Sequence, residues 1–328
     1  MNRYLGLFFL ILFLIPLKAF ASWQDHENAP PLPATEHIRP KHVYALASLL
    51  AEEIESVRYL MGITKINDSL LQVVDAEPRE VYFQAVNLYG KINRLHHNLT
   101  ARSLADHDLP AIQQNIRPAD VWGVLAVTLD QLDEIKDEYG ISTHSPFPDL
   151  REKILPTDVY QSLLVTIRQT NQMLEERPYT HSDVYQEIST ALYCTLNIYN
   201  SFPGMPIQKQ PVLQPGKTAT DVFIELIYTY QTIRNIMRAS GLKTLELSAT
   251  PSPNIKPGDV YDLAVLITSE LKFLHSKVAS QKTLHDAAYP GIQFPSHVFQ
   301  RLTYLHKHLH VIQEKMLKPP HRTWEQQP

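Results

Sequence analysis

The chain has 328 residues, a formal net charge of −4 and a single cysteine. One cysteine excludes an internal disulfide, and the slight acidic balance argues against a nucleic-acid partner, because phosphate backbones bind basic surfaces. The length is sufficient for one large domain or two smaller ones.

The first 21 residues have the pattern of a secretory signal peptide. Arg3 precedes a nearly unbroken apolar run from Leu5 to Leu17, and Ala19–Ala21 forms an A-x-A cleavage site. An uncleaved anchor is the less favoured alternative, since the run is shorter than the roughly 20 residues that span a bilayer. We expect cleavage after Ala21, then a disordered proline-rich leader over residues 22–37. The predicted location is the periplasm, or secretion beyond it, without membrane insertion after cleavage.

One sequence register recurs eight times after the leader. Each copy has a valine followed by an aromatic residue, with apolar residues 4 and 14 positions after the valine. These offsets lie on one side of a helix, so each copy predicts an amphipathic helix of about 20 residues. The valines are Val43, Val81, Val121, Val159, Val184, Val222, Val260 and Val298.

The residues just before each valine have the composition of a helix start. Six of the eight copies have proline three positions before the valine, where a helix needs no N–H. Six have Asp or Glu directly before the valine, where a carboxylate meets the positive end of the helix dipole. The two copies without proline have Thr180 and Thr218 at the N-cap, with Asp183 and Asp221 three residues later, as in a capping box. We therefore interpret the repeated P-x-D-V-aromatic pattern as helix initiation rather than a catalytic loop.

Successive valines are 38 to 40 residues apart, except for one interval of 25 residues between the fourth and fifth copies. Most linkers are long enough to run back along a helix, which lets successive helices be parallel. The short connection between Glu176 and Thr180 instead predicts that the fourth and fifth helices are antiparallel neighbours. The predicted fold is all-α, with eight tandem repeat units of ~38 residues, each a helix plus a long linker. Two groups of four units span residues 38–177 and 178–318, and a C-terminal tail covers 319–328.

The sequence contains few candidates for chemistry. It has no G-x-S-x-G motif and no glycine-rich phosphate loop, so we predict no catalytic residue and no cofactor. His306 and His310, one helical turn apart, are weak candidates for metal ligands. Basic neighbours disfavour a cation there, so no metal is predicted. Cys194 is interpreted as a small buried hydrophobic residue.

These observations favour an exported, soluble helical-repeat protein that acts as an interaction scaffold or adaptor in the cell envelope. The first alternative is a periplasmic sensor or small-ligand-binding protein with a pocket between helices. A further alternative is an all-helical envelope enzyme that assembles its site from distant residues. The last repeat is basic, and we expect it to contact an acidic envelope protein. The predicted contact residues are Lys307, His308, Lys315 and Lys318.

Overall fold

The computed structural model describes residues 37–65, 71–100, 115–174, 178–249, 255–278 and 284–317. The predicted signal peptide, the leader up to residue 36 and the tail 319–328 lie outside these ranges. The described part of the chain is predominantly helical, which confirms the all-α class. None of its helices combines the length and the apolar character that crossing a bilayer requires.

Each of the eight helices in the described residues begins at the first helical position that the sequence pattern predicts. The helices are α2 (Pro40–Leu60), α3 (Pro78–Thr100), α4 (Pro118–Glu138), α5 (Pro156–Met173), α6 (His181–Tyr199), α7 (Ala219–Ala239), α8 (Pro257–Val278) and α9 (Pro295–Leu317). Two short strands, β1 (Leu71–Val74) and β2 (Glu246–Ala249), form an antiparallel sheet that the sequence analysis did not predict.

At the start of every described helix, one side chain accepts a hydrogen bond from the backbone N–H of the N-cap residue. In α6, for example, Asp183 Oδ2 accepts the N–H of Thr180 at 2.7 Å. In α2 and α9 the acceptor is Nδ1 of a histidine, at 3.0 Å for His42 and 3.2 Å for His297. The sequence analysis missed these two histidines, which take the place of the carboxylate. The eight acceptors are His42, Glu80, Asp120, Asp158, Asp183, Asp221, Asp259 and His297.

The repeated apolar positions form the core. All eight valines, and the apolar residues 4 and 14 positions after each, are at most 3% exposed. The aromatic residue beside the valine is less uniform. Four of these rings are buried and four lie partly exposed.

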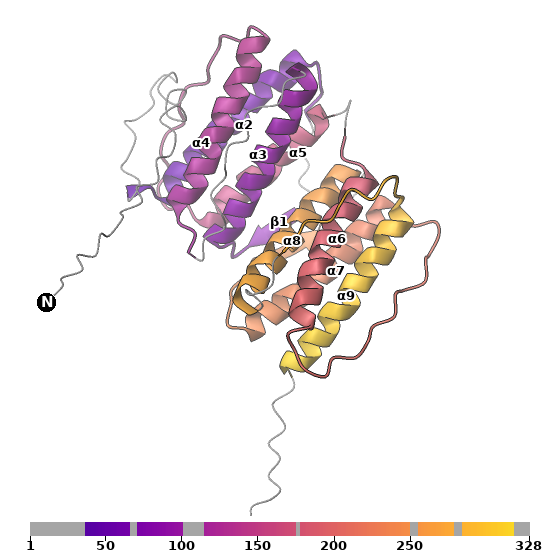
Figure 1. Ribbon diagram of the computed structural model, residues 1–328. Helices are drawn as coiled ribbons and strands as arrows, with labels where there is room; N and C mark the ends of the chain where they lie inside the picture. Colours follow the sequence, from indigo (N-terminus) through magenta and orange to yellow (C-terminus); the bar gives the residue numbers. More distant parts are fainter. Residues whose placement is uncertain are drawn as a thin grey trace, which may run out of the picture.

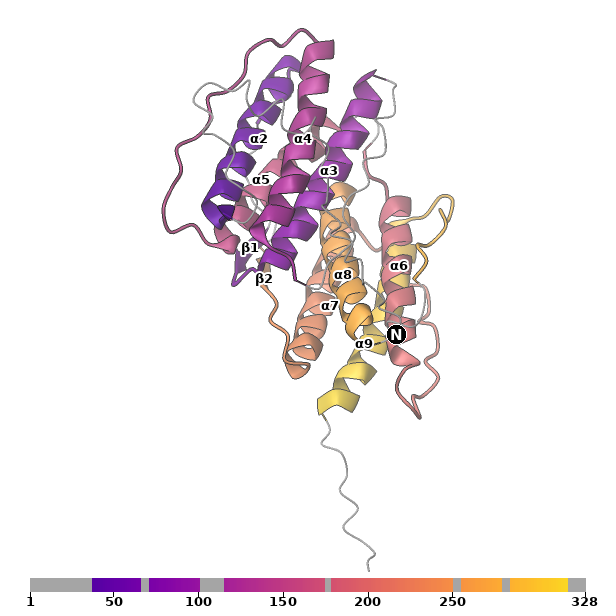
Figure 2. The same cartoon turned by 60° about the vertical axis from the view of Figure 1, so that its left-hand side comes forward.

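The helices pack in two sets. Helices α2 and α3 each pack against both α4 and α5, and α6 and α7 each pack against both α8 and α9. The first and second helices of a set therefore lie diagonally opposite each other, and so do the third and fourth. Figures 1 and 2 show the two sets side by side. The expected pairing of α5 with α6 is wrong, because α6 buries its apolar face against α8 and α9 instead.

Contacts between helix ends show that the helices of one set point the same way. Gln84, near the start of α3, donates a hydrogen bond to Tyr160, near the start of α5, at 2.8 Å. Tyr139, just past the end of α4, donates to the carbonyl of Leu99 near the end of α3, also at 2.8 Å. The long linkers must therefore return along the outside of the helices, as Figure 1 shows for the segment between α6 and α7.

The two sets meet at a polar junction between α3 and α8, next to the β1–β2 sheet (Figure 2). Arg79 at the start of α3 contacts Glu270 in the second half of α8, at 3.2 Å. Lys91, further along α3, contacts Asp262 near the start of α8, at 2.7 Å. These contacts show that α3 and α8 run in opposite directions.

Two fully buried carboxyl groups share Arg79 at this junction. Its Nη2 lies 3.4 Å from Glu80 and 3.2 Å from Glu270. Glu80 also accepts the N–H of Leu245 at 2.8 Å, which ties the approach to β2 to the start of α3. Burial raises the pKa of both carboxyl groups, and the charge of Glu270 raises the pKa of Glu80 further. One proton shared between the two groups leaves a single negative charge to balance Arg79.

We predict that Glu270→Gln flattens the pH dependence of stability. A raised carboxyl pKa contributes stability that is complete below the ordinary pKa of 4.5 and is lost as the pH rises through the raised value. A glutamine amide still accepts a hydrogen bond from Arg79 but does not titrate. Thermal unfolding between about pH 5 and about pH 9 measures the effect. The exposed Glu314→Gln is the control, and an equally steep decline in both variants would contradict the prediction.

Candidate functional site

A cavity of about 700 Å³ opens between α2 and α5. We call it the α2–α5 groove. Helix α2 contributes Tyr44, Ala51, Glu52 and Glu55. The last three lie 7, 8 and 11 residues after Tyr44, about two or three helical turns, so all four share one stripe of the helix surface. Helix α5 contributes a matching stripe, and Lys65 and Ser145 complete the lining. The α5 residues are Asp158, Gln161, Ser162, Val165, Thr166 and Gln169.

A buried amide at the edge of the cavity has no partner. Gln169 is 3% exposed, lines the groove and makes no hydrogen bond with the residues that the structure describes. Thr166, one turn earlier, is satisfied by the carbonyl of Ser162 at 2.9 Å. The amide of Gln169 is thus available to hydrogen-bond a ligand that enters the groove.

The three carboxylates of the groove differ in how they are used. Glu55 is held by Arg58 at 2.5 Å and by Lys65 at 3.4 Å. Asp158 uses Oδ2 to accept the N–H of Leu155 at the start of α5, at 2.8 Å. The side-chain carboxylate of Glu52 has neither a hydrogen bond nor an ion pair within the described ranges. Partial burial, and the negative charge of Glu53 beside it, raise the pKa of Glu52.

A buried charge cluster lies next to the groove, connected to it by Ser145. The backbone N–H of Ser145 donates to Glu53 Oε1 at 2.5 Å. The other carboxylate oxygen of Glu53 pairs with Lys136 of α4, and both side chains are fully buried. Burial acts to raise the pKa of Glu53, but the bonds from Lys136 and Ser145 outweigh it and hold the pKa below its ordinary value. This pair attaches the linker after α4 to the wall of the groove.

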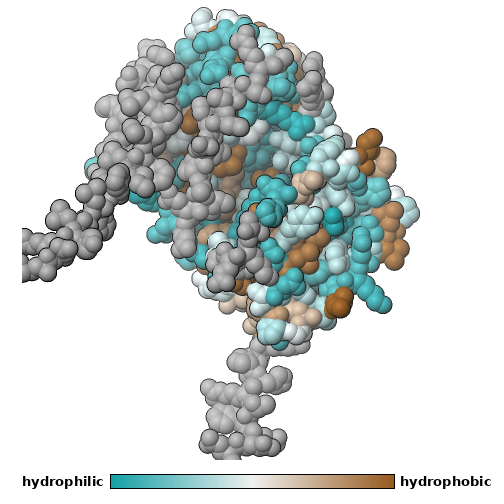
Figure 3. All heavy atoms as spheres, viewed as in Figure 1, coloured by the Kyte–Doolittle hydropathy of each residue, from teal (hydrophilic) through white to brown (hydrophobic). Residues whose placement is uncertain are grey.

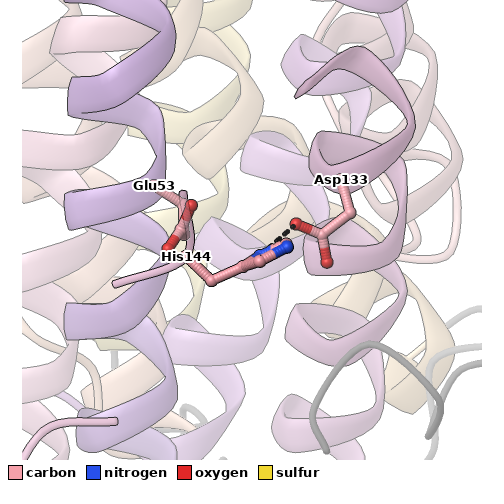
Figure 4. A group of neighbouring side chains, drawn as sticks. All are labelled: Glu53, Asp133 and His144. Carbon is pink, nitrogen blue, oxygen red and sulfur yellow. Dashed lines mark ion pairs between the residues drawn. The ribbon is translucent and has the colours of Figure 1, made fainter. Parts of the chain in front are cut away.

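Two further side chains approach the cluster, as Figure 4 shows. His144 Nδ1 lies 3.8 Å from Asp133 Oδ1, and one ligand atom from each of Glu53, Asp133 and His144 falls within 4.8 Å of the others. Carboxylate and imidazole groups so arranged have the chemistry of a divalent metal site. However, the ammonium of Lys136 is bound to Glu53 and lies 3.4 Å from His144 Nδ1. A metal ion would have to displace Lys136, so we assign the cluster as an ion-pair network.

The histidines that the sequence suggested as metal ligands do not come together. His306 bonds to Glu225 at 2.7 Å through Nδ1 and to Thr232 at 3.0 Å through Nε2, which joins α9 to α7. His310 instead lies 3.5 Å from Glu314 on its own helix. Both ring nitrogens of His306 are therefore used in helix packing, and no metal-type cluster within the described ranges includes either residue.

The predicted basic contact surface is smaller than the sequence suggested. Lys307 and Lys315 are exposed on α9, but His308 is 3% exposed. Its ring packs edge-on against Tyr199 and Tyr304, and so it cannot contact a partner. Lys318 lies outside the described residues.

No protein-family model, curated protein or solved structure matches this chain. Cys194 is 1% exposed, and burial raises the pKa of its thiol to about 11, so the thiol stays protonated and inert at neutral pH.

The α2–α5 groove is the candidate functional site. Sequence reasoning missed it because its two walls are separated by more than a hundred residues.

We predict that Lys136→Met lowers the free energy of unfolding by about 3–5 kcal/mol, because it leaves Glu53 buried without its counter-charge. Urea denaturation measures the change. The double variant Glu53→Gln/Lys136→Met should recover part of the loss, since no uncompensated charge remains. Lys307→Met, on the exposed face of α9, should change stability by less than about 0.5 kcal/mol. If Lys136→Met and Lys307→Met lowered the free energy of unfolding equally, the assignment of Glu53 and Lys136 as a buried ion pair would be refuted.

Proposed function

We propose that this chain is an exported binding protein that holds a small polar ligand in the α2–α5 groove. The observation that carries the proposal is a cavity of about 700 Å³ lined by Gln169, a largely buried residue whose amide has no hydrogen-bond partner among the described residues. Ligand sites in proteins commonly have volumes of about 300–1,000 Å³ and a few convergent polar groups. The groove has both properties.

The walls of the groove are suited to binding without rearrangement. Both are regular helices whose buried faces pack against each other and against α3 and α4. The charge cluster of Glu53 and Lys136 holds Ser145 in place at the side of the groove. Side chains on such rigid elements are positioned before the ligand arrives, which lowers the entropy cost of binding.

The eight helices are proposed to be tandem repeat units in two groups of four. The support is that the two sets pack in the same order along the chain, with the first and second helices each between the third and fourth. Export is proposed from the signal-peptide pattern of residues 1–21. The ligand would then be a molecule of the cell envelope or its surroundings.

The groove proposal can be tested by filling the cavity. Native mass spectrometry of the mature protein, after incubation with a small-molecule extract of the envelope, should show a bound species. Ala51→Trp places a large ring in the groove and should abolish the added mass. Ala239→Trp, at the exposed end of α7, should leave the added mass unchanged. Full retention of the species by a folded Ala51→Trp variant would refute the proposal.

A second function, as an interaction scaffold, is favoured by exposed apolar side chains in the second set. Ile292 is 82% exposed and Val212 is 85% exposed, on two different linkers. The linker that contains Val212 lies against α9, because the carbonyl of Pro211 accepts a hydrogen bond from Gln300 at 2.7 Å, and the linker that contains Ile292 leads into the same helix. Figure 3 shows several separate hydrophobic side chains exposed on this half of the molecule. Lys307 and Lys315 lie on the exposed face of α9.

For the scaffold function we predict that Ile292→Asp combined with Val212→Asp weakens capture of an envelope protein by the immobilised chain. Charges placed on an apolar contact surface are costly to bury. The control is Ala51→Trp, which changes the groove and leaves this surface intact. Cross-linking followed by mass spectrometry identifies the captured protein. Capture that survives the double variant and is lost in Ala51→Trp would place the partner at the groove instead.

A further inference from the structure

We propose that the ligand of the α2–α5 groove is a linear aliphatic polyamine, with ammonium groups near its two ends bound by Glu52 and Asp158. The inference rests on the proposed binding function and specifies the chemistry of the ligand. It depends on which lining groups are free, how far apart they lie and what separates them.

Two carboxylates of the groove have unused acceptor oxygens. Glu52 has no partner among the described residues, and Asp158 uses only Oδ2, for the N–H of Leu155. Glu55, in contrast, is already neutralised by Arg58 and Lys65. The free negative charges therefore belong to opposite walls, with Glu52 on α2 and Asp158 on α5. A ligand that satisfies both must carry two positive groups.

The common register of the two parallel helices sets the distance between these charges. Asp158 lies directly before the repeated valine of α5, whereas Glu52 lies nine residues after the repeated valine of α2. Ten residues of helix correspond to about 15 Å along the axis. The groove is thus long, and a compact ligand such as a single amino acid cannot reach both carboxylates. An extended polyamine chain of the length of spermine can.

The surface between the two charges suits methylene groups. Val165 of α5 lies between the two carboxylates, with Tyr44 near Asp158 and Ala51 beside Glu52. Gln161, Ser162 and Thr166 line the same stretch. Apolar side chains with a carboxylate at each end match the alternation of methylene and ammonium groups in a polyamine. A neutral sugar of the same length would leave both carboxylates without counter-charges.

The side chain of Gln169 provides separate evidence that the α2–α5 groove binds a ligand. Its amide is 3% exposed, lines the groove and has no partner within the described part of the chain. In the shared register it lies one position beyond Glu52, so it belongs to the same end of the groove. An N–H of the ammonium group that Glu52 binds would also reach its carbonyl oxygen.

Isothermal titration calorimetry of the full mature chain with spermine tests the proposal. We expect one spermine per chain, weaker binding of spermidine, and no measurable binding of butylamine, which has one ammonium group. Glu52→Gln and Asp158→Asn should each lower the spermine affinity about tenfold, corresponding to about 1.4 kcal/mol per charge-assisted contact. Asparagine at 158 retains an oxygen for the N–H of Leu155, so the start of α5 is preserved.

The matched control is Glu314→Gln, which removes an exposed carboxylate on α9 and should leave spermine binding unchanged. Equal loss of affinity in Glu314→Gln and Glu52→Gln would show a general charge effect and overturn the proposal. Tighter binding of a tetralysine peptide than of spermine would also overturn it, because the groove would then recognise a protein segment.

The titration also separates this inference from the proposed function. If Ala51→Trp removes a species bound from the envelope extract while spermine gives no heat, the groove is a ligand site and the polyamine is wrong. If neither the extract species nor spermine binds the unmodified protein, both proposals fail. Binding of spermine that Ala51→Trp abolishes supports both.

Discussion

The hydrogen bond at each helix start is the local constraint from which the rest of the architecture follows. It fixes where the helix begins relative to its valine, and so each buried stripe has the same height and direction. Helices with a common start can pack in parallel only when their linkers return along the outside. The long linkers and the diagonal order within each set are consequences of that geometry.

The same register also determines the geometry of the groove. Because α2 and α5 begin at equivalent positions and run parallel, residues of similar offset lie at similar heights along the cavity. Carboxylates at unequal offsets, such as Glu52 and Asp158, must then lie far apart along the axis. A groove between antiparallel helices would pair different residues. The proposed preference for a long ligand thus comes from the helix starts.

Charge is buried in two places, each with a different structural effect. At the junction, Arg79 connects the two sets of helices by binding both Glu80 and Glu270. These ion pairs form only in one relative position of α3 and α8, whereas an apolar contact would allow the two helices to shift along each other. Beside the groove, Lys136 and Glu53 hold a linker against a helix. Buried ion pairs of this kind add little net stability, but removing one member strongly lowers the free energy of unfolding because the other charge stays buried without its partner. Their contribution is to specify one arrangement of elements that share the same apolar pattern.

The sequence by itself determined the helical class and the start of every described helix, because valine spacing, proline and capping residues act within a few positions of each other. It also placed Cys194 in the interior. Only the tertiary structure decided that α6 packs with α8 and α9, that His308 is buried between two tyrosines, and that Glu52 and Asp158 share a groove. A pattern repeated eight times cannot specify which copies become neighbours, since all present the same apolar face. That choice depends on residues that differ between copies, such as Arg79, Lys91 and Glu270, and these act across long separations in the chain.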